Sequence, residues 1–232
     1  MEKLRAYVHT YPRQEIQQEA LVNDLGSFHR FLEVAASMHG QVVNQAAISR
    51  DAAVARATVQ RFFETLVDTL VGHLLPAWQP RARVRERAKP KFYFFDPGVV
   101  RAILDVADEP LSDSEAGALL EGYLLHELRA AISCQGLGVR LCYWSTPGSK
   151  EIDFVWIKGS RRVAIEVKNA RRWRPEYAKT INELIDAGLI SRGFVVYRGK
   201  ERYRSKNVEG LPVEELLSLL YTEEFHGIDR RE

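Results

Sequence analysis

The sequence has few of the features that mark secreted, membrane-spanning or zinc-binding proteins. Cysteine occurs only at Cys134 and Cys142, and the spacing forms no Cys-x-x-Cys motif. We therefore expect two buried thiols in a reducing compartment rather than a zinc site. The histidines are scattered without metal-ligand pairing. No apolar run reaches the roughly 18 residues that a spanning helix needs, and the N-terminus lacks the apolar stretch of a signal peptide. These absences predict a cytoplasmic protein with no membrane partner.

A phosphate-binding loop of the form Gly-x-x-x-x-Gly-Lys-Ser/Thr is also missing, so the chain as it stands is not an ATPase. Neither sign of charge dominates, because 33 Lys and Arg against 31 Asp and Glu give a net charge of +2. Basic residues nevertheless gather in 81–91 and 161–174. Local basic stretches in a nearly neutral chain predict contact with a polyanion at particular places.

The first part of the chain has the pattern of helices followed by a hairpin. Residues 1–26 are expected to form a helical linker that Pro12 interrupts, and Ser27 is expected to cap the next helix. Apolar residues then recur at helical spacing up to Met38. Two short helices, 45–53 and 56–70, are separated by small residues, which favours a helix-turn-helix.

Strands are expected at 74–78 and 91–95, so we predict a winged helix-turn-helix over residues 27–98. The second helix of the pair would place its first turns in a DNA groove, and the extended basic segment would line up cations along a phosphate backbone. The predicted DNA-binding residues are Arg56, Thr58, Gln60, Arg61, Arg81, Arg83, Arg85 and Arg87. The alternative is a packing module that binds protein.

The second part of the chain, residues 99–232, predicts a mixed α/β domain. A polar loop at 109–114 precedes an amphipathic helix from Ala118, and strands are expected at 139–144, 152–157, 162–167 and 193–197. A helix at about 175–187 separates the last two strands, and a final helix follows Pro212. This αβββαβ order defines the α/β fold class of the domain.

The strands carry two carboxylates and a lysine that could act together. Asp153 lies on one strand, and Glu166 and Lys168 lie two residues apart on the next, so they share a face. The turn at 158–159 pairs the strands and brings Asp153 beside Glu166. Two carboxylates can hold Mg²⁺ or Mn²⁺, which activates water and polarises a phosphodiester, while the lysine orients water or neutralises charge. Glu121, on the preceding helix, is predicted as a further metal ligand.

These motifs resemble the PD-(D/E)xK nuclease superfamily, with Ile152 at the position of the proline. The resemblance is closer to the C-terminal region of a prokaryotic AAA-type ATPase family, catalogued as domain of unknown function 4143. The segments that carry it are Lys91–Gly98, Leu120–Leu128, Tyr143–Phe154 and Ile165–Lys168. It implies a winged helix followed by a restriction-endonuclease-like domain, with an ATPase domain in cis in full-length relatives. Residues 7–16 resemble the stretch that links that ATPase domain to the winged helix.

Two functions from different classes follow. The first is a Mg²⁺-dependent DNA endonuclease with Asp153, Glu166 and Lys168 as catalytic residues and Arg171 and Arg172 as nearby phosphate contacts. The second is a catalytically inactive nuclease fold used as a DNA- or protein-binding module of an ATPase. For the three residues themselves, the alternative is a surface ion-pair network on a hairpin. A homo-oligomer is compatible with either function, and a role in toxin–antitoxin or defence systems is a third reading that no residue supports.

Overall fold

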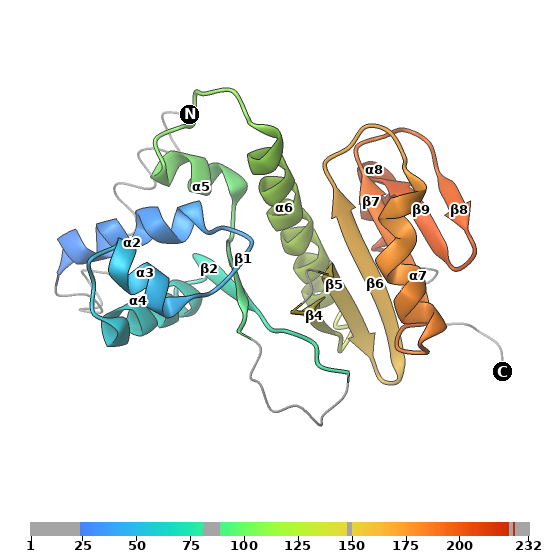
Figure 1. The fold of residues 1–232 in the computed structure, drawn as a ribbon, viewed down its shortest axis with the longest axis horizontal. Coiled ribbons are helices and arrows are strands. Elements are labelled where there is room, and N and C mark those ends of the chain that lie inside the picture. Colours follow the sequence, from blue (N-terminus) through green and yellow to red (C-terminus); the bar gives the residue numbers. More distant parts are fainter. Residues whose placement is uncertain (1–23, 81–88, 148–149, 223–224, 226–232) are drawn as a thin grey trace. The chain divides into compact units, whose positions relative to one another are not determined.

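A computed structural model describes residues 24–80, 89–147, 150–222 and 225. The chain forms two compact units (Figure 1), whose described parts are residues 24–75 with 89–123, and residues 76–80 with 124–225. The division differs from the predicted boundary at residue 98, because helix α5 packs with the first unit. No helix in the described ranges is long and apolar enough to cross a membrane. The predicted helical linker lies outside the described residues, apart from its last three positions.

The first unit places helices on a three-stranded sheet with the order β1-β3-β2. Both strand pairs are antiparallel. Its elements are α2 (Leu25–Ser37), β1 (Gln41–Val42), α3 (Gln45–Asp51), α4 (Arg56–Asp68), β2 (Gly72–Leu75), β3 (Lys91–Phe94) and α5 (Pro97–Ile103), and helix α6 (Asp113–Cys134) begins in this unit.

Local side-chain contacts set where these helices start. Asp24, not the predicted Ser27, caps α2, because its carboxylate accepts the backbone N–H of Ser27 at 3.1 Å. Asn44 caps α3 in the same way. Asp96 accepts the backbone N–H groups of Gly98 and Val99 and thereby caps the start of α5.

A single aromatic core joins α2, α4 and β3. Phe62 lies 5.0 Å from Phe28 and 5.2 Å from Phe31, measured between ring centroids, and Phe63 lies 4.9 Å from Phe92. Ile48, Val54, Val59, Phe62 and Leu66, from the two predicted short helices and the residues between them, are all buried in it. Burial of each such side chain contributes roughly 1.5–3 kcal/mol.

The second unit contains a six-stranded mixed sheet with the order β4-β5-β6-β7-β9-β8. Strands β6, β7 and β9 run parallel, and the remaining neighbours are antiparallel. The elements are β4 (Arg140–Ser145), β5 (Glu151–Lys158), β6 (Arg161–Lys168), a 3₁₀ turn η1 (Pro175–Ala178), α7 (Lys179–Asp186), β7 (Arg192–Tyr197), β8 (Tyr203–Ser205), β9 (Val208–Pro212) and α8 (Val213–Leu219).

Helix α7 covers one face of this sheet, as Figure 1 shows. Ile181 packs with Ala164 of β6 and Val195 of β7 in one buried cluster. On the opposite face Phe225 contacts Trp156 and Phe194, with ring centroids 5.1 and 5.4 Å apart. Covering both faces explains why the central strands read as nearly continuous apolar runs.

Two expectations about single segments were wrong. The strand predicted at 74–78 ends at Leu75, and Trp78 instead donates its backbone N–H to the Tyr143 carbonyl at 2.6 Å, within the second unit. Cys142 is buried as expected, and burial raises its thiol pKa, but Cys134 is exposed.

Candidate active site

Strands β5 and β6 position the two carboxylates and the lysine that the sequence singled out. Phe154 pairs with Ile165, so Asp153 and Glu166 occupy the next positions of the antiparallel hairpin. Residues opposite each other in such a pair project from the same face of the sheet, which here is the face that α7 covers. Asp153 and Glu166 are each only 9% exposed.

Asp153 is fixed to the backbone of the neighbouring strand. Its Oδ2 atom accepts the N–H of Val167 at 2.7 Å, and Val167 lies between Glu166 and Lys168. A charged acceptor makes such a hydrogen bond stronger than a neutral one. The bond therefore anchors the Asp153 carboxylate at the point of β6 where the other two side chains emerge.

Glu166 and Lys168 form a direct ion pair. The Lys168 Nζ atom donates to Glu166 Oε1 at 2.5 Å, and the two side chains are 34% and 12% exposed, respectively. Burial alone would lower the pKa of Lys168, but the Glu166 carboxylate, and to a smaller extent the Asp153 carboxylate, raise it. The ammonium therefore stays charged at neutral pH and can stabilise negative charge, but it cannot serve as a general base.

The ends of the parallel strands bring further groups to this edge. Lys168 pairs with Tyr197 in the register of β6 and β7, and the Tyr177 side chain of η1 acts electrostatically on Lys168. Arg198 Nη1 donates to Asn169 Oδ1 at 2.9 Å and joins the loops that follow β6 and β7. The sequence did not identify either residue as a neighbour of the site. Asn169 lies in the loop after β6, and no periodicity places the helical segment that carries Tyr177 beside Lys168.

The predicted phosphate contacts separate into two groups. Arg171 and Arg172 are exposed in the loop that begins just after Lys168. Arg161 and Arg162 belong to the predicted basic stretch 161–174, which was expected to surround the carboxylates and contact phosphate, but they lie at the start of β6. Because a strand rises about 3.3 Å per residue, Arg161 lies on the order of 23 Å from Lys168 along β6. That expectation was wrong for both residues.

Glu121 belongs to a different contact network in the first unit. Its Oε1 atom accepts from Lys91 Nζ at 2.9 Å and from the Tyr93 hydroxyl. Lys91 is 4% exposed, so this is a buried ion pair that fixes α6 against β3. Lys91 was also expected to share an exposed basic face with residues 81–89, and its burial shows that part of the expectation to be wrong.

The metal-ligand set is smaller than the sequence suggested. In the described part of the chain no group of three or more His, Cys, Asp or Glu side chains is placed to hold a metal ion. Asp153 and Glu166 still provide two carboxylates at one place, and Mg²⁺ is commonly held by one or two carboxylates with water and substrate phosphate completing its shell. The donor chemistry therefore fits a divalent ion without Glu121.

The predicted DNA-binding side chains of the first unit lie on α4. Arg56, Gln60 and Arg61 are exposed and Thr58 is half-buried. Gln60 Nε2 donates to Glu64 Oε1 at 3.0 Å, one turn further along the helix. The remaining predicted contacts, Arg81, Arg83, Arg85 and Arg87, lie outside the described residues.

The chain is similar to proteins that are themselves uncharacterized. Uncharacterized proteins of Mycobacterium bovis and Mycobacterium tuberculosis are each 26% identical over 215 residues, which is 91% of this chain and 47% of the relative. The chain thus spans about half the length of the curated relatives it matches. Residues 1–110 match the family model "Domain of unknown function (DUF8612)". Residues 116–216 match the family model "Domain of unknown function (DUF4143)", which confirms the resemblance expected from the sequence for that part of the chain.

Proposed function

We propose that the second unit is a nuclease-like module that binds a divalent metal ion and hydrolyses phosphodiesters in DNA. The observation that carries the proposal is the placement of Asp153, Glu166 and Lys168 on one face at the adjoining ends of β5 and β6. The order α6, β4, β5, β6, α7, β7 supports it, because it is the element order that the restriction-endonuclease-like resemblance implies.

Each of the three side chains has a distinct role in this proposal. Asp153 and Glu166 would hold Mg²⁺ or Mn²⁺, which when bound supplies Lewis acidity at the phosphodiester and lowers the pKa of a water ligand. The backbone hydrogen bond of Asp153 keeps that carboxylate oriented. Lys168, held in its charged form, would stabilise the negative charge that builds up on phosphorus oxygens. The exposed Arg171 and Arg172 would contact flanking phosphates.

Plasmid nicking by the full chain tests the proposal. We expect Mg²⁺ or Mn²⁺ to support nicking, and Asp153→Asn and Glu166→Gln each to lower the rate by roughly 100-fold or more, since each removes a charged metal ligand. Asp186→Asn is the matched control, because Asp186 is an exposed carboxylate at the end of α7. This variant should keep the wild-type rate.

Metal binding by the same proteins distinguishes a site that cannot bind a divalent ion from a metal-binding site that has been tested with the wrong nucleic acid. Mn²⁺ should raise the melting temperature of the wild type and of Asp186→Asn, but not that of Asp153→Asn. If neither ion shifts the melting temperature and no single- or double-stranded DNA is cut, the hydrolytic proposal fails.

The first unit carries a second candidate function, that of a DNA-binding module. Its order of helix, strand, two helices and a two-stranded hairpin, with β1 added to the sheet, supports a winged helix. The exposed Arg56, Gln60 and Arg61 on α4 support groove or phosphate contact by that helix. An ATPase domain in cis is the partner that the family resemblance implies, and a binding module without hydrolysis is the alternative should the cleavage test fail.

A further inference from the structure

The second unit contains a cavity of about 660 Å³ at the opposite end of the sheet from Asp153 and Glu166. It is lined by the turn before β6, the start of β7 and the hairpin that joins β8 to β9. Strands β6 and β7 are parallel, so their starts lie at one edge and the candidate active site lies at the other. The cavity is therefore not part of the site described above.

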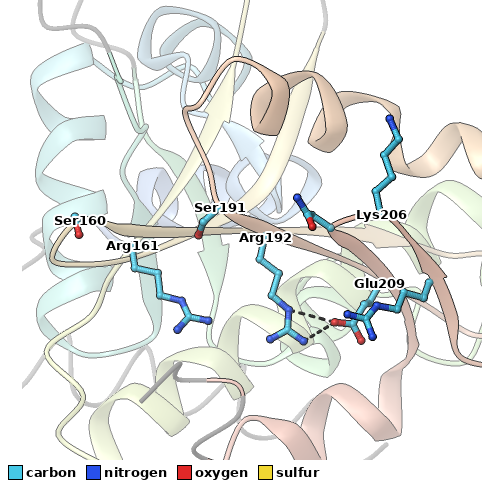
Figure 2. A pocket seen from close by; sticks show the side chains of 8 residues that line it. Ser160, Arg161, Ser191, Arg192, Lys206 and Glu209 are labelled. Atoms are coloured by element: carbon cyan, nitrogen blue, oxygen red, sulfur yellow. Dashed lines mark hydrogen bonds and ion pairs between the residues drawn. The ribbon is translucent and has the colours of Figure 1, made fainter. Parts of the chain in front are cut away.

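Arginines dominate the lining of this cavity. Arg161, Arg192, Arg204 and Lys206 line it together with a single carboxylate, Glu209. Arg161 and Arg192 extend to the same side of the strands, while Lys206 extends to the other side (Figure 2). An adjoining cavity of about 400 Å³ shares Arg192, Arg204 and Glu209 and adds Arg202. The two cavities together form a groove with a large excess of guanidinium groups.

Glu209 holds two of these arginines in fixed positions. It is 8% exposed, its Oε1 accepts from Arg192 Nε at 3.2 Å and its Oε2 accepts from Arg202 Nη2 at 3.0 Å. Burial alone would raise the pKa of Glu209, but the hydrogen bond and charge of Arg192, together with Arg202, lower it. The Arg192 guanidinium also lies 4.6 Å from the centroid of the Phe194 ring. Such support gives Arg192 one orientation before any ligand arrives.

The charge of Arg161 and Arg204 is not balanced in this way. Within the described ranges, neither side chain makes a hydrogen bond or ion pair that would neutralise it. A guanidinium presents a planar set of donors that matches the oxygens of a phosphate, and several converging guanidiniums suit an anion with more than one charge. Every residue that lines the larger cavity has a polar or charged side chain, so the groove suits a charged ligand better than an apolar one.

We infer that this groove binds the phosphate group of a phosphate ester, carried either by a nucleotide or by a nucleic-acid strand. The inference does not rest on the proposed hydrolysis, since it uses no residue of the Asp153 site. If the groove takes a strand, it gives the second unit a phosphate contact far from the reacting bond. If it takes a nucleotide, it is a separate ligand site.

Titration of the full chain with three probes in EDTA tests the inference. The probes are inorganic phosphate, adenosine monophosphate and a fluorescent single-stranded decanucleotide, with dissociation constants measured by calorimetry or fluorescence anisotropy. We expect Arg161→Gln and Arg204→Gln each to weaken binding by about 10-fold, because each removes a charge-assisted contact. Arg140→Gln, on the opposite edge strand β4, removes an exposed arginine of the same unit and should change binding less than about twofold.

The three probes distinguish the source of the phosphate. Weakened binding of adenosine monophosphate in the Arg161 and Arg204 variants supports a nucleotide site, and weakened binding of the decanucleotide alone supports a strand contact. The inference is overturned if the wild type binds none of the probes at millimolar concentration, or if the double variant Arg161→Gln/Arg204→Gln binds them as Arg140→Gln does. EDTA removes divalent ions, so a failure of hydrolysis at Asp153 leaves this result unaffected.

Discussion

His39 is a buried imidazole whose surroundings favour its neutral form. It is 4% exposed, and its Nδ1 atom accepts the backbone N–H of Phe94 at 3.2 Å. The Tyr93 ring lies edge-on at 5.5 Å between centroids, and a Cβ atom at Gly122 would come within 2.3 Å of His39 Nε2. Burial disfavours the charged form and lowers the pKa of His39 to about 4.

This shift predicts a loss of stability in mild acid. Between pH 6.5 and pH 4 the unfolded histidine binds a proton that the folded one does not, so the free energy of unfolding falls as pH falls through that window. From pH 7 to pH 5 the loss is about 2 kcal/mol. Urea unfolding at pH 7 and at pH 5 should show this loss of stability in the wild type. The control variant His29→Gln, which changes an exposed histidine, should show the same loss. If the free energy of unfolding of His39→Gln falls between pH 7 and pH 5 as much as that of the wild type, the prediction is wrong.

Single residues show how far the sequence could specify the candidate site. Glu166 and Lys168 could be paired in advance because a two-residue spacing on a strand fixes the face on which both lie. The hydrogen bond from the Val167 backbone N–H to the Asp153 carboxylate could not be predicted, because the sequence does not specify which carboxylate oxygen accepts from which N–H group. Glu121 was assigned to the metal because its helix precedes the strands, but a buried lysine 30 residues earlier holds it instead.

At the scale of elements, the long strands of the second unit were predictable, and the two short strands at one side of its sheet were not. β5 and β6 carry continuous apolar runs of the length that a buried strand needs. β8 and β9 were missed because Arg202 and Arg204 make the first look like a loop and Gly210 and Pro212 break the second. The alternation of Arg202, Arg204 and Lys206 was the one available signal for an exposed edge strand, and therefore for the arginine groove.

Gly210 shows how tightly β9 is packed against the loop after β6. A Cβ atom there would lie 2.5 Å from Trp173, whose ring stacks on Tyr203 at 5.4 Å with an angle of 11°. Gly210→Ala should therefore lower the free energy of unfolding by about 1–3 kcal/mol, measured by urea unfolding, because Trp173 must leave its stack.

A second alanine substitution provides the comparison for this prediction. Gly26 lies in the first turn of α2, and an added Cβ would meet its nearest atom at 3.4 Å, an ordinary contact. Gly26→Ala should leave stability unchanged or raise it by up to about 1 kcal/mol, since alanine is the better helix former. Equal effects of the two substitutions would show that the contact of Gly210 with Trp173 does not matter.

At the scale of the whole molecule, the proposed hydrolysis and the proposed DNA binding by α4 belong to different units. The second unit carries both the carboxylate site and the arginine groove, at opposite ends of one sheet. The first unit carries exposed cations on α4 and a buried ion pair between Lys91 and Glu121. The proposed DNA binding by α4 and the proposed hydrolysis at Asp153 therefore depend on different residues, so substitutions can test each proposal separately.

The salt dependence of DNA binding tests the assignment of α4. Each phosphate contact contributes about 0.9 to the slope of log K against log salt concentration. Arg56→Ala/Arg61→Ala should therefore weaken binding to duplex DNA and make the slope shallower by about 1.8, measured by fluorescence anisotropy between 50 and 300 mM salt. Arg140→Gln should keep the wild-type slope, since Arg140 lies in β4 of the second unit. A slope that the double variant leaves unchanged would assign the phosphate contacts to other residues, and α4 would then be a surface for protein rather than DNA.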